Sequence, residues 1–460
     1  MRQIFLSILA LAFVSDTFAD YKLYEGEHGA LSAGLQLQTA SFSELNNQSG
    51  GSAKDNLTDV FLELSAKPYL NAALNLPTDS KLYGGFSYVY SSTTGHDPSG
   101  YTEDNVDLYF QETDYTELSS YNNYRGKSMT EELYLGWQSG KLLDNAGKNT
   151  LDISLGRQNY KLGSGFLLFY GADNGGKRGA GWLNPRTAFD NTLIGRVNVQ
   201  DVKLEGFHLE TRPLNPAEKR HYQGGNIEYK PSERASVGLS YINTTNSRSL
   251  HDEGSTIPLA EQSVNNDTYD ARADFSPLPD VTLSAEYVHQ VNTETTSAFE
   301  ATDKTRVHAD GGFGGIEYKR QDLLWQPAVS YRYAIQDEHF DAMSPGFTTW
   351  GTWFQGEING EWVLNNTNLI THQGKLVMTP TENLALNLVY LNYQFMNPDV
   401  FALTASHYGN EVDFLTDWEI NETVSLYAGI EAFVPDEAGK QYLGGNKVWL
   451  QGMAAASFEF

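Results

Sequence analysis

The side chains best suited to chemistry in this sequence are positively charged and lie in one glycine-rich stretch. Between residues 160 and 189 the chain carries four basic residues and one acidic residue, although its formal net charge is −27. The basic residues are Lys161, Lys177, Arg178 and Arg186, and the acidic residue is Asp173. Clustered cations attract anionic solutes. We therefore expect this stretch to form a basic constriction on a path for anions.

Strand-like patterns flank this stretch on both sides. Residues 151–155 place an apolar side chain at every second position, and residues 193–199 again read as a strand. The segment between them is far too long for a hairpin turn. We predict a loop, about residues 160–190, that folds inward from two strands of a β-barrel wall.

Further cations fall on the polar phase of the predicted strands, which would face a water-filled lumen. Guanidinium groups pair well with carboxylates, so the arginines are the strongest candidates for a solute path. The predicted pore-lining cations of the wall are Arg157, Arg196, Lys203, Arg272, Arg332 and Lys375. Arg157 has the wrong parity unless a β-bulge precedes it. The alternative is that these cations only pair with wall carboxylates across strands.

No catalytic or metal-binding motif emerges from the sequence. Residues 171–177 have the glycine and lysine spacing of a phosphate-binding loop, but Arg178 stands where the Mg²⁺-binding hydroxyl belongs. Residues 173–175 are an ordinary turn, or they supply oxygen ligands to a loop Ca²⁺. The chain has no cysteine, and its ten histidines show no metal-ligand spacing. We predict no catalytic residue, no metal and no cofactor, and therefore no enzyme.

Alternating strands account for the rest of the chain. From residue 28 onward, blocks of about nine to twelve residues alternate apolar and polar side chains, which is the length of a tilted membrane-crossing strand. A single block would fit a soluble β-sandwich equally well. The connections, however, alternate short and long along the whole chain, as in outer-membrane barrels. We predict an all-β, antiparallel transmembrane barrel of about 18 strands, with short periplasmic turns and long extracellular loops.

The two ends of the chain indicate export. Residues 1–19 carry Arg2, an apolar run and a small-x-small site, which is typical of a signal peptide. Residues 20–460 would form the barrel, and no later apolar run reaches 18 residues. The final alternating strand ends in Phe460, which we expect the outer-membrane assembly machinery to bind. Localisation would be the outer membrane of a Gram-negative bacterium, with lipid and lipopolysaccharide as partners, and the acidity argues against nucleic acid.

Several short patches resemble those of the alginate-export family of outer-membrane porins. They are residues 156–158 (Gly-Arg-Gln), Trp182, Pro185 and Arg186 in the glycine-rich stretch, residues 188–190, residues 353–361 and residues 365–369. The resemblance implies an 18-stranded, monomeric, passive barrel whose arginine-lined lumen passes a polyuronate outward.

The combined prediction is a passive channel for an anionic sugar or polyuronate such as alginate, working in export. One alternative is a substrate-specific porin for uptake of small carboxylates or oligosaccharides. A barrel hydrolase with its site at the rim, or an adhesin built from the acidic loops, is a further alternative. The basic stretch and the inward arginines are the reason for placing the channel for an anionic solute first.

Overall fold

The computed structural model describes residues 21–47, 58–95, 124–143, 147–172, 179–213, 219–246, 265–295, 304–346 and 355–460. The predicted signal peptide, Lys177 and Arg178 lie outside these residues. Within them, no helix has the length and apolar character needed to span a membrane. The helical elements are short: η1 (Pro77–Asp79), α2 (Asn359–Trp362), η5 (Pro398–Phe401) and α3 (Glu437–Leu443).

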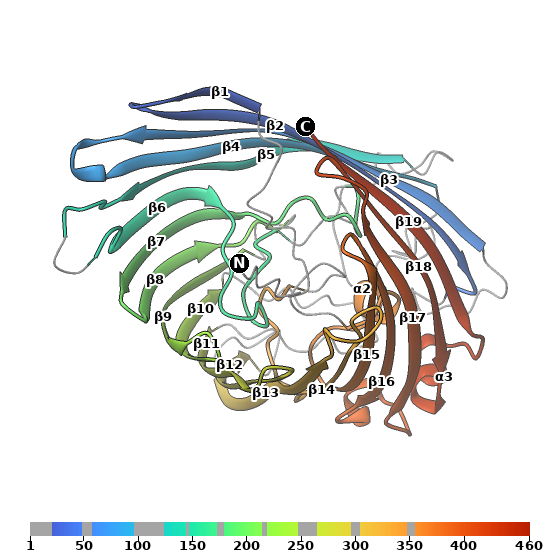
Figure 1. Cartoon of the computed structure of the whole chain (residues 1–460). Coiled ribbons are helices and arrows are strands. Elements are labelled where there is room, and N and C mark those ends of the chain that lie inside the picture. The colour runs from blue at the N-terminus through green and yellow to red at the C-terminus, as the bar shows by residue number, and fades with distance from the viewer. Residues whose placement is uncertain are drawn as a thin grey trace.

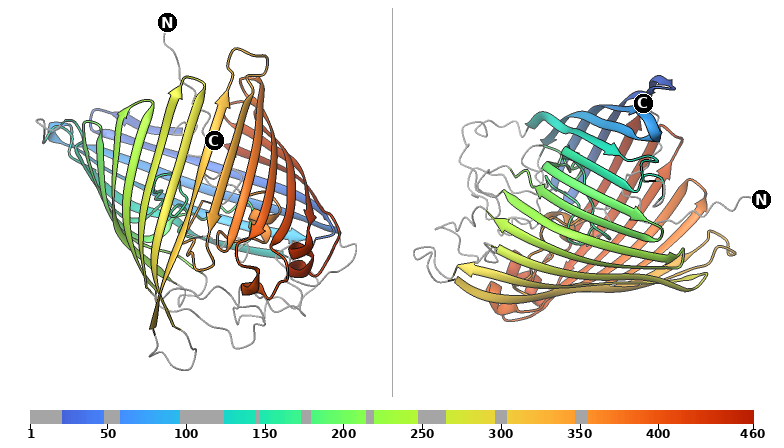
Figure 2. Two further views of the ribbon diagram at one scale, coloured as in Figure 1. Left: turned by 90° about the horizontal axis from the view of Figure 1, so that it is seen from below. Right: turned by 90° about the vertical axis from the view of Figure 1, so that its left-hand side faces the viewer.

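The strands form one closed antiparallel barrel (Figures 1 and 2). They are β1 (Tyr21–Gly26), β2 (Gly29–Leu45), β3 (Thr58–Asn75), β4 (Lys81–Gly95), β5 (Tyr124–Gln138), β6 (Leu151–Gln158), β7 (Phe189–Val199), β8 (Val202–Glu210), β9 (Arg220–Ser232), β10 (Ala235–Asn246), β11 (Asn265–Leu278), β12 (Val281–Thr295), β13 (Lys304–Lys319), β14 (Ala328–Gln336), β15 (Leu369–Thr381), β16 (Leu384–Phe395), β17 (His407–Glu419), β18 (Val424–Pro435) and β19 (Trp449–Glu459). Strands β2 to β19 make the ring, so the prediction of an 18-stranded antiparallel barrel is confirmed.

Closure of the ring covers the edge of β2, the first strand of the barrel, along most of its length. Strand β19 pairs with the C-terminal part of β2, from Leu450 opposite Leu45 to Glu459 opposite Gln36. Phe460 then exchanges two backbone hydrogen bonds with Leu35. The remaining edge of β2 pairs with the short strand β1. An open strand edge cannot be tolerated in lipid, and this arrangement covers it.

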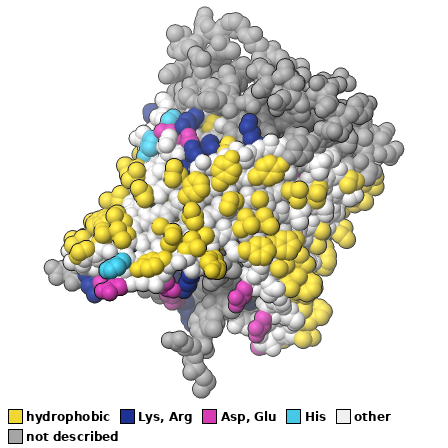
Figure 3. All heavy atoms as spheres, turned by 90° about the horizontal axis from the view of Figure 1, so that it is seen from above, with side chains coloured by type: hydrophobic (Ala, Val, Ile, Leu, Met, Phe, Trp, Pro, Cys, Tyr) yellow, Lys and Arg dark blue, Asp and Glu magenta, His cyan; other side chains and the backbone are white. Residues whose placement is uncertain are grey.

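Side chains of the wall alternate between an outward apolar phase and an inward phase. On β18 the outward Ile430 is 70% exposed, whereas its inward neighbour Glu431 is buried. Apolar side chains form a broad band on the face shown in Figure 3, and charged and histidine side chains gather along its edges. This band is the surface that a bilayer requires of a barrel. Short connections such as residues 200–201 between β7 and β8 lie at one end of the barrel, here called the turn end. The opposite end is the loop end.

Two connections from the loop end lie inside the ring of strands (Figure 1). The first lumen segment, which is residues 159–172 and 179–188, lies between β6 and β7 in the chain, and the second lumen segment, which is residues 337–346 and 355–368, lies between β14 and β15. The described part of the second segment contains α2 and no wall strand. The core of the protein therefore lies between these segments and the inner wall.

Candidate solute path through the barrel

Buried wall carboxylates hold the first lumen segment in place. Glu131 on β5 accepts hydrogen bonds from the backbone N–H groups of Thr187 (2.7 Å) and Ala188 (2.8 Å). Glu63 on β3 accepts from the backbone N–H of Trp182 (3.2 Å) and from that of the next residue (2.9 Å). Since a loop has backbone donors without strand partners, an inward carboxylate is a suitable acceptor for them.

A third carboxylate, Glu411 on β17, holds the second lumen segment in the same way. It accepts hydrogen bonds from the backbone N–H groups of Ile358 (2.8 Å) and Asn359 (2.9 Å). The side-chain amide of Asn359 (2.5 Å) and the hydroxyl of Tyr393 (3.2 Å) also donate to it. Glu411 is completely buried, so a set of protein donors replaces its hydration.

The two lumen segments contact each other directly. Ser344 of the second segment forms a parallel β-bridge with Leu168 of the first, and the Phe169 N–H donates to the Ser344 carbonyl at 2.7 Å. The Trp182 indole N–H donates to Glu357 at 3.0 Å. Each lumen segment is thus held partly by contacts with the other. Together the two segments occupy part of the lumen as one unit.

Apolar side chains complete this unit in two clusters. In the first cluster, Trp182 lies with its ring centroid 5.6 Å from Phe42 and 5.6 Å from Tyr427. In the second cluster, Phe166 packs against Phe340 and the inward wall of β7 to β14. Apolar packing on this scale fixes the position of the segments more firmly than their hydrogen bonds alone.

Charged side chains line the inner wall between these apolar clusters and the turn end. Three cations on β7, β8 and β11 lie directly opposite a carboxylate of the next strand; the pairs are Arg196 with Glu205, Lys203 with Glu228, and Arg272 with Glu286. The ion-pair distances are 3.0 Å from Arg196 to Glu205, 3.8 Å from Lys203 to Glu228 and 3.0 Å from Arg272 to Glu228. Arg272 also pairs with Asp270. These three cations are therefore part of a cross-strand charge ladder, the alternative left open by the sequence.

Arg332 and Lys375 extend this inward row on β14 and β15. In the ladder Arg332 lies opposite Gln373, two residues from Lys375 on the same face. The Arg332 guanidinium lies over the Phe313 ring, 5.3 Å from its centroid. Lys375 has no ion pair within 4.0 Å among the residues that the structure describes, although Asp417 and Glu317 act on it electrostatically. Neither cation faces a carboxylate in register, unlike the three before them.

The first lumen segment rests on this charged wall. The Ser164 hydroxyl donates to Glu286 at 2.5 Å. Gly163 has φ +51°, and a Cβ there would collide with the guanidinium of Arg272, so glycine is needed for this close approach. Lys161 lies half-buried beside the Phe169 ring, 5.5 Å from its centroid. Burial lowers the pKa of Lys161 from its ordinary value.

Arg186 was predicted to line the path, but the structure places it elsewhere. Its side chain is 0% exposed, and its guanidinium donates to the Ser91 hydroxyl (2.6 Å) and the Lys127 carbonyl (2.9 Å). A fully buried guanidinium cannot contact a diffusing solute. Arg186 instead fixes the end of the first lumen segment to β4 and β5.

Arg157 also lies away from the lumen. It pairs with the outward Leu133 of β5, and on its other side, in the pairing with β7, it is the bulged residue between Gly156 and Gln158. Its guanidinium forms an ion pair with Asp190 at 2.5 Å and donates to the Thr130 carbonyl. Arg157 therefore belongs to a group of ion pairs at the loop end of β5 to β9, and this position does not support the prediction that it lines the pore.

The anchoring carboxylates were not singled out from the sequence. Glu63 falls on the inward phase of an alternating strand, whereas the alternation places Glu132 inward and its neighbour Glu131 outward; a register shift between β4 and β5 lies at this point. Glu411 carried no prediction, and Glu357 belongs to a long loop. The one available signal was that carboxylates recur on the inward phase. A path for anions does not need them, so their presence indicates another role. Their donors lie far away in the chain, so no local pattern reveals the pairing.

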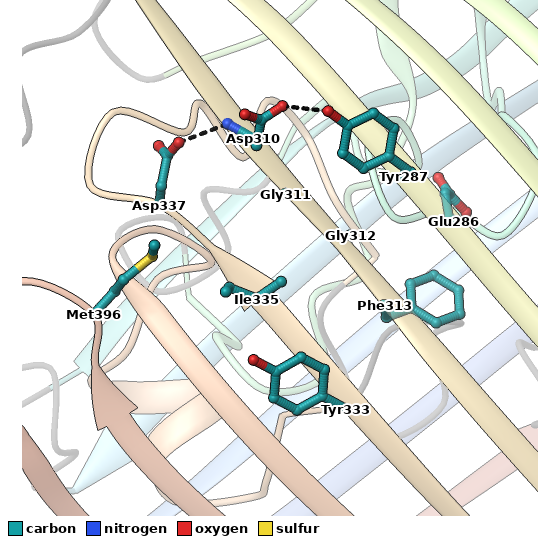
Figure 4. A pocket seen from close by; sticks show the side chains of 10 residues that line it. All are labelled: Glu286, Tyr287, Asp310, Gly311, Gly312, Phe313, Tyr333, Ile335, Asp337 and Met396. Atoms are coloured by element: carbon teal, nitrogen blue, oxygen red, sulfur yellow. Dashed lines mark hydrogen bonds between the residues drawn. The ribbon is translucent and has the colours of Figure 1, made fainter.

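A cavity of about 300 Å³ lies at β12 to β14 (Figure 4). Tyr287, Tyr333 and Ile335, which line it, belong to the outward phase, and Gly312 leaves a gap between the two tyrosines. At its edge the Tyr287 hydroxyl donates to Asp310 at 2.6 Å. The inward residues Glu286 and Phe313 line it as well, so the cavity lies within the wall at β12 to β14.

Comparisons with known proteins agree on the architecture. No family model and no curated protein matches the sequence. Among solved structures, OccK5 (OpdH) of Pseudomonas aeruginosa is similar with a TM-score of 0.54 and 10% identity, over 93% of this chain and 98% of that one. A BenF-like porin from Pseudomonas fluorescens Pf-5 gives 0.54 and 12%, over 94% and 98%. OccAB4 of Acinetobacter baumannii gives 0.53 and 9%, over 94% and 99%.

The fold is that of an outer-membrane porin. A closed 18-stranded barrel with a lipid-facing apolar band places the protein in the outer membrane of a Gram-negative bacterium, as predicted. The comparisons do not support the resemblance to the alginate-export family, because the similar structures are Occ and Opd porins. At these identities the likeness extends to the fold and leaves the solute open.

Proposed function

We propose that this protein is a passive, substrate-selective porin for the uptake of small carboxylates. The observation that carries the proposal is the position of Arg332 and Lys375, two cations on the inward face of the neighbouring strands β14 and β15, close to the aromatic ring of Phe313. Carboxylates elsewhere in the lumen, such as Glu63, Glu131 and Glu411, are buried as acceptors for the lumen segments. The charge that a solute meets is therefore more positive than the composition indicates.

The chemistry of this pair suits a small anion. A guanidinium offers two parallel donors to a carboxylate, and an ammonium adds a point charge beside it. The aromatic ring of Phe313 beneath Arg332 is a surface on which a flat solute can lie. A carboxylate between the two cations would relieve their mutual repulsion, which favours entry.

The similar structures support the same solute class. One of them is OpdK of Pseudomonas aeruginosa in a structure with vanillate, which has a TM-score of 0.52 and 11% identity to this chain. Vanillate is a small aromatic carboxylate. Uptake of such a solute replaces the polyuronate export expected from the sequence. Passage needs binding that is weak enough for release, which fits two partly compensated cations better than a closed site.

The proposal is tested by recording the purified protein in planar bilayers. We expect anion preference in a salt gradient, and a concentration-dependent reduction of the chloride current by vanillate. The double variant Arg332→Gln/Lys375→Gln is expected to lose most of the anion preference and the vanillate effect. The matched control is Lys230→Gln, which removes a cation from the exposed turn end of β9.

The outcomes separate the alternatives. Cation preference of the wild type, or a vanillate effect that survives in the double variant, would refute the proposal. Glucuronate is the second probe, because sugar acids carry the same carboxylate on a non-aromatic ring. A stronger effect of glucuronate than of vanillate would support the anionic-sugar reading in place of the small aromatic carboxylate.

A further inference from the structure

Two histidines and a glutamate come together on the outer face of the barrel, near the loop end of β8 and β9. His208 and Glu210 lie two residues apart on β8, and His221 on β9 is directly opposite Glu210 in the ladder. All three belong to the outward phase, together with the exposed Leu204 and Ile227. We propose that His208, Glu210 and His221 bind a divalent transition-metal ion of the zinc class.

The distances between the candidate ligand atoms fit this proposal. The Glu210 Oε1 atom lies 3.5 Å from His208 Nε2 and 3.6 Å from His221 Nδ1, and all three atoms lie within 4.8 Å of one another. Ligands about 2.1 Å from a tetrahedral Zn²⁺ are about 3.4 Å apart. The two distances from Glu210 to the imidazole nitrogens are therefore close to the required length. A small rotation of one imidazole ring would bring the two nitrogens to the same distance from each other.

The surroundings orient the carboxylate for this role. The other oxygen of Glu210, Oε2, accepts hydrogen bonds from Asn191 Nδ2 (2.8 Å) and from the Lys219 ammonium (2.7 Å). Lys219 also binds Asp190 at 3.1 Å, which balances its charge. These contacts direct Oε1 toward the two imidazoles, as partners of a metal ligand commonly do.

The ligand set selects the class of metal. Two imidazole nitrogens and one carboxylate oxygen suit Zn²⁺, Ni²⁺ or Cu²⁺, whereas Ca²⁺ and Mg²⁺ need a shell of oxygens. The side chains of His208, Glu210 and His221 are 36%, 19% and 32% exposed, so an ion can enter and a water or a lipid phosphate can complete the shell.

A second outward histidine pair brings fewer free ligand atoms together than His208, Glu210 and His221 do. His289 and His308 stack with ring centroids 5.4 Å apart, and Asp310 contacts His289 at 2.9 Å. The same oxygen of Asp310 already accepts the Tyr287 hydroxyl. Of the parts of the chain that the structure describes, only the first group brings three ligand atoms within 4.8 Å.

The test is titration of the tag-free, detergent-solubilised barrel with Zn²⁺ by calorimetry, with Co²⁺ absorption as a second measurement of coordination. We expect one equivalent of Zn²⁺ to bind. His208→Gln, His221→Gln and Glu210→Gln should each weaken binding about tenfold or more. His372→Gln is the matched control, because His372 is outward on β15, hydrogen-bonds to Tyr331 and, among the described residues, belongs to no group of three ligand atoms. Ca²⁺ in excess should not displace Zn²⁺.

Folding is checked by β-sheet circular dichroism and heat-modifiable gel mobility, which the exposed substitutions should leave unchanged. The proposal is overturned if the wild type binds no Zn²⁺. It is equally overturned if a folded His208→Gln/His221→Gln double variant binds Zn²⁺ with wild-type affinity, which would place the ion at other histidines.

Discussion

Glu411 provides the sharpest test of how the lumen segments are held. Its carboxylate accepts two backbone N–H groups of the second lumen segment, at 2.8 and 2.9 Å, as well as the Asn359 amide. Substitution Glu411→Ala removes every one of these contacts. The barrel itself keeps its ladder, because backbone hydrogen bonds of β17 do not use the side chain.

The size of the effect follows from the buried donors. Each buried donor left without a partner costs about 1–3 kcal/mol, so the two backbone donors alone cost about 2–6 kcal/mol. At about 1.4 kcal/mol per tenfold change, 4 kcal/mol shifts the equilibrium between docked and undocked segment nearly a thousandfold. A segment that is firmly docked in the wild type would then spend a substantial fraction of time released, and the lumen would widen.

Single-channel recording measures this directly. We expect Glu411→Ala to show larger conductance with frequent transitions between levels, while the wild type stays at one lower level. The matched control is Glu419→Ala, an exposed glutamate at the turn end of the same strand. If a folded Glu411→Ala barrel conducts like the wild type and with equal noise, this carboxylate does not hold the constriction.

Two further substitutions test packing and the lipid-facing wall. Trp182→Ala should cost about 3–5 kcal/mol of unfolding free energy, because the ring is buried against Phe42 and Tyr427 of the inner wall. The same change at the exposed Trp325 in a turn should cost about 0.5 kcal/mol or less. Thermal unfolding compares the two variants. Ile430→Arg, in the middle of β18, should cost about 2–4 kcal/mol for folding into phospholipid vesicles, whereas Leu142→Arg in the turn after β5 should not change folding. Equal costs at both positions would contradict the outward phase of β18.

The wall was predictable because its signal repeats with a period of two. Leucines at 31, 35 and 37 and the inward Glu63 fall on the phases that the sequence assigned to them. Short connections between strands carry turn-forming residues, for example Pro77 and Asn421. Every membrane-crossing strand has its own alternation of apolar and polar side chains, so a wrong assignment in one strand does not affect the assignment of the next.

The positions of the charged side chains were not predictable in the same way. Whether Arg196 faces Glu205 depends on register, and whether Arg157 faces in or out depends on where the bulge near Gly156 lies. Contacts of the lumen segments span still longer separations, such as Trp182 with Glu357, which are 175 residues apart. Such pairs follow from tertiary packing, and no local periodicity encodes them.

This division also explains how a strongly acidic chain can favour an anion. Carboxylates that accept backbone N–H groups, as Glu63, Glu131 and Glu411 do, carry no water-facing charge into the lumen. Most inward cations of β7 to β11 are balanced in register, so they add little net field. In the proposed function, the selectivity of the path would depend on the inward cations Arg332 and Lys375, and the net charge of the whole chain would not predict it.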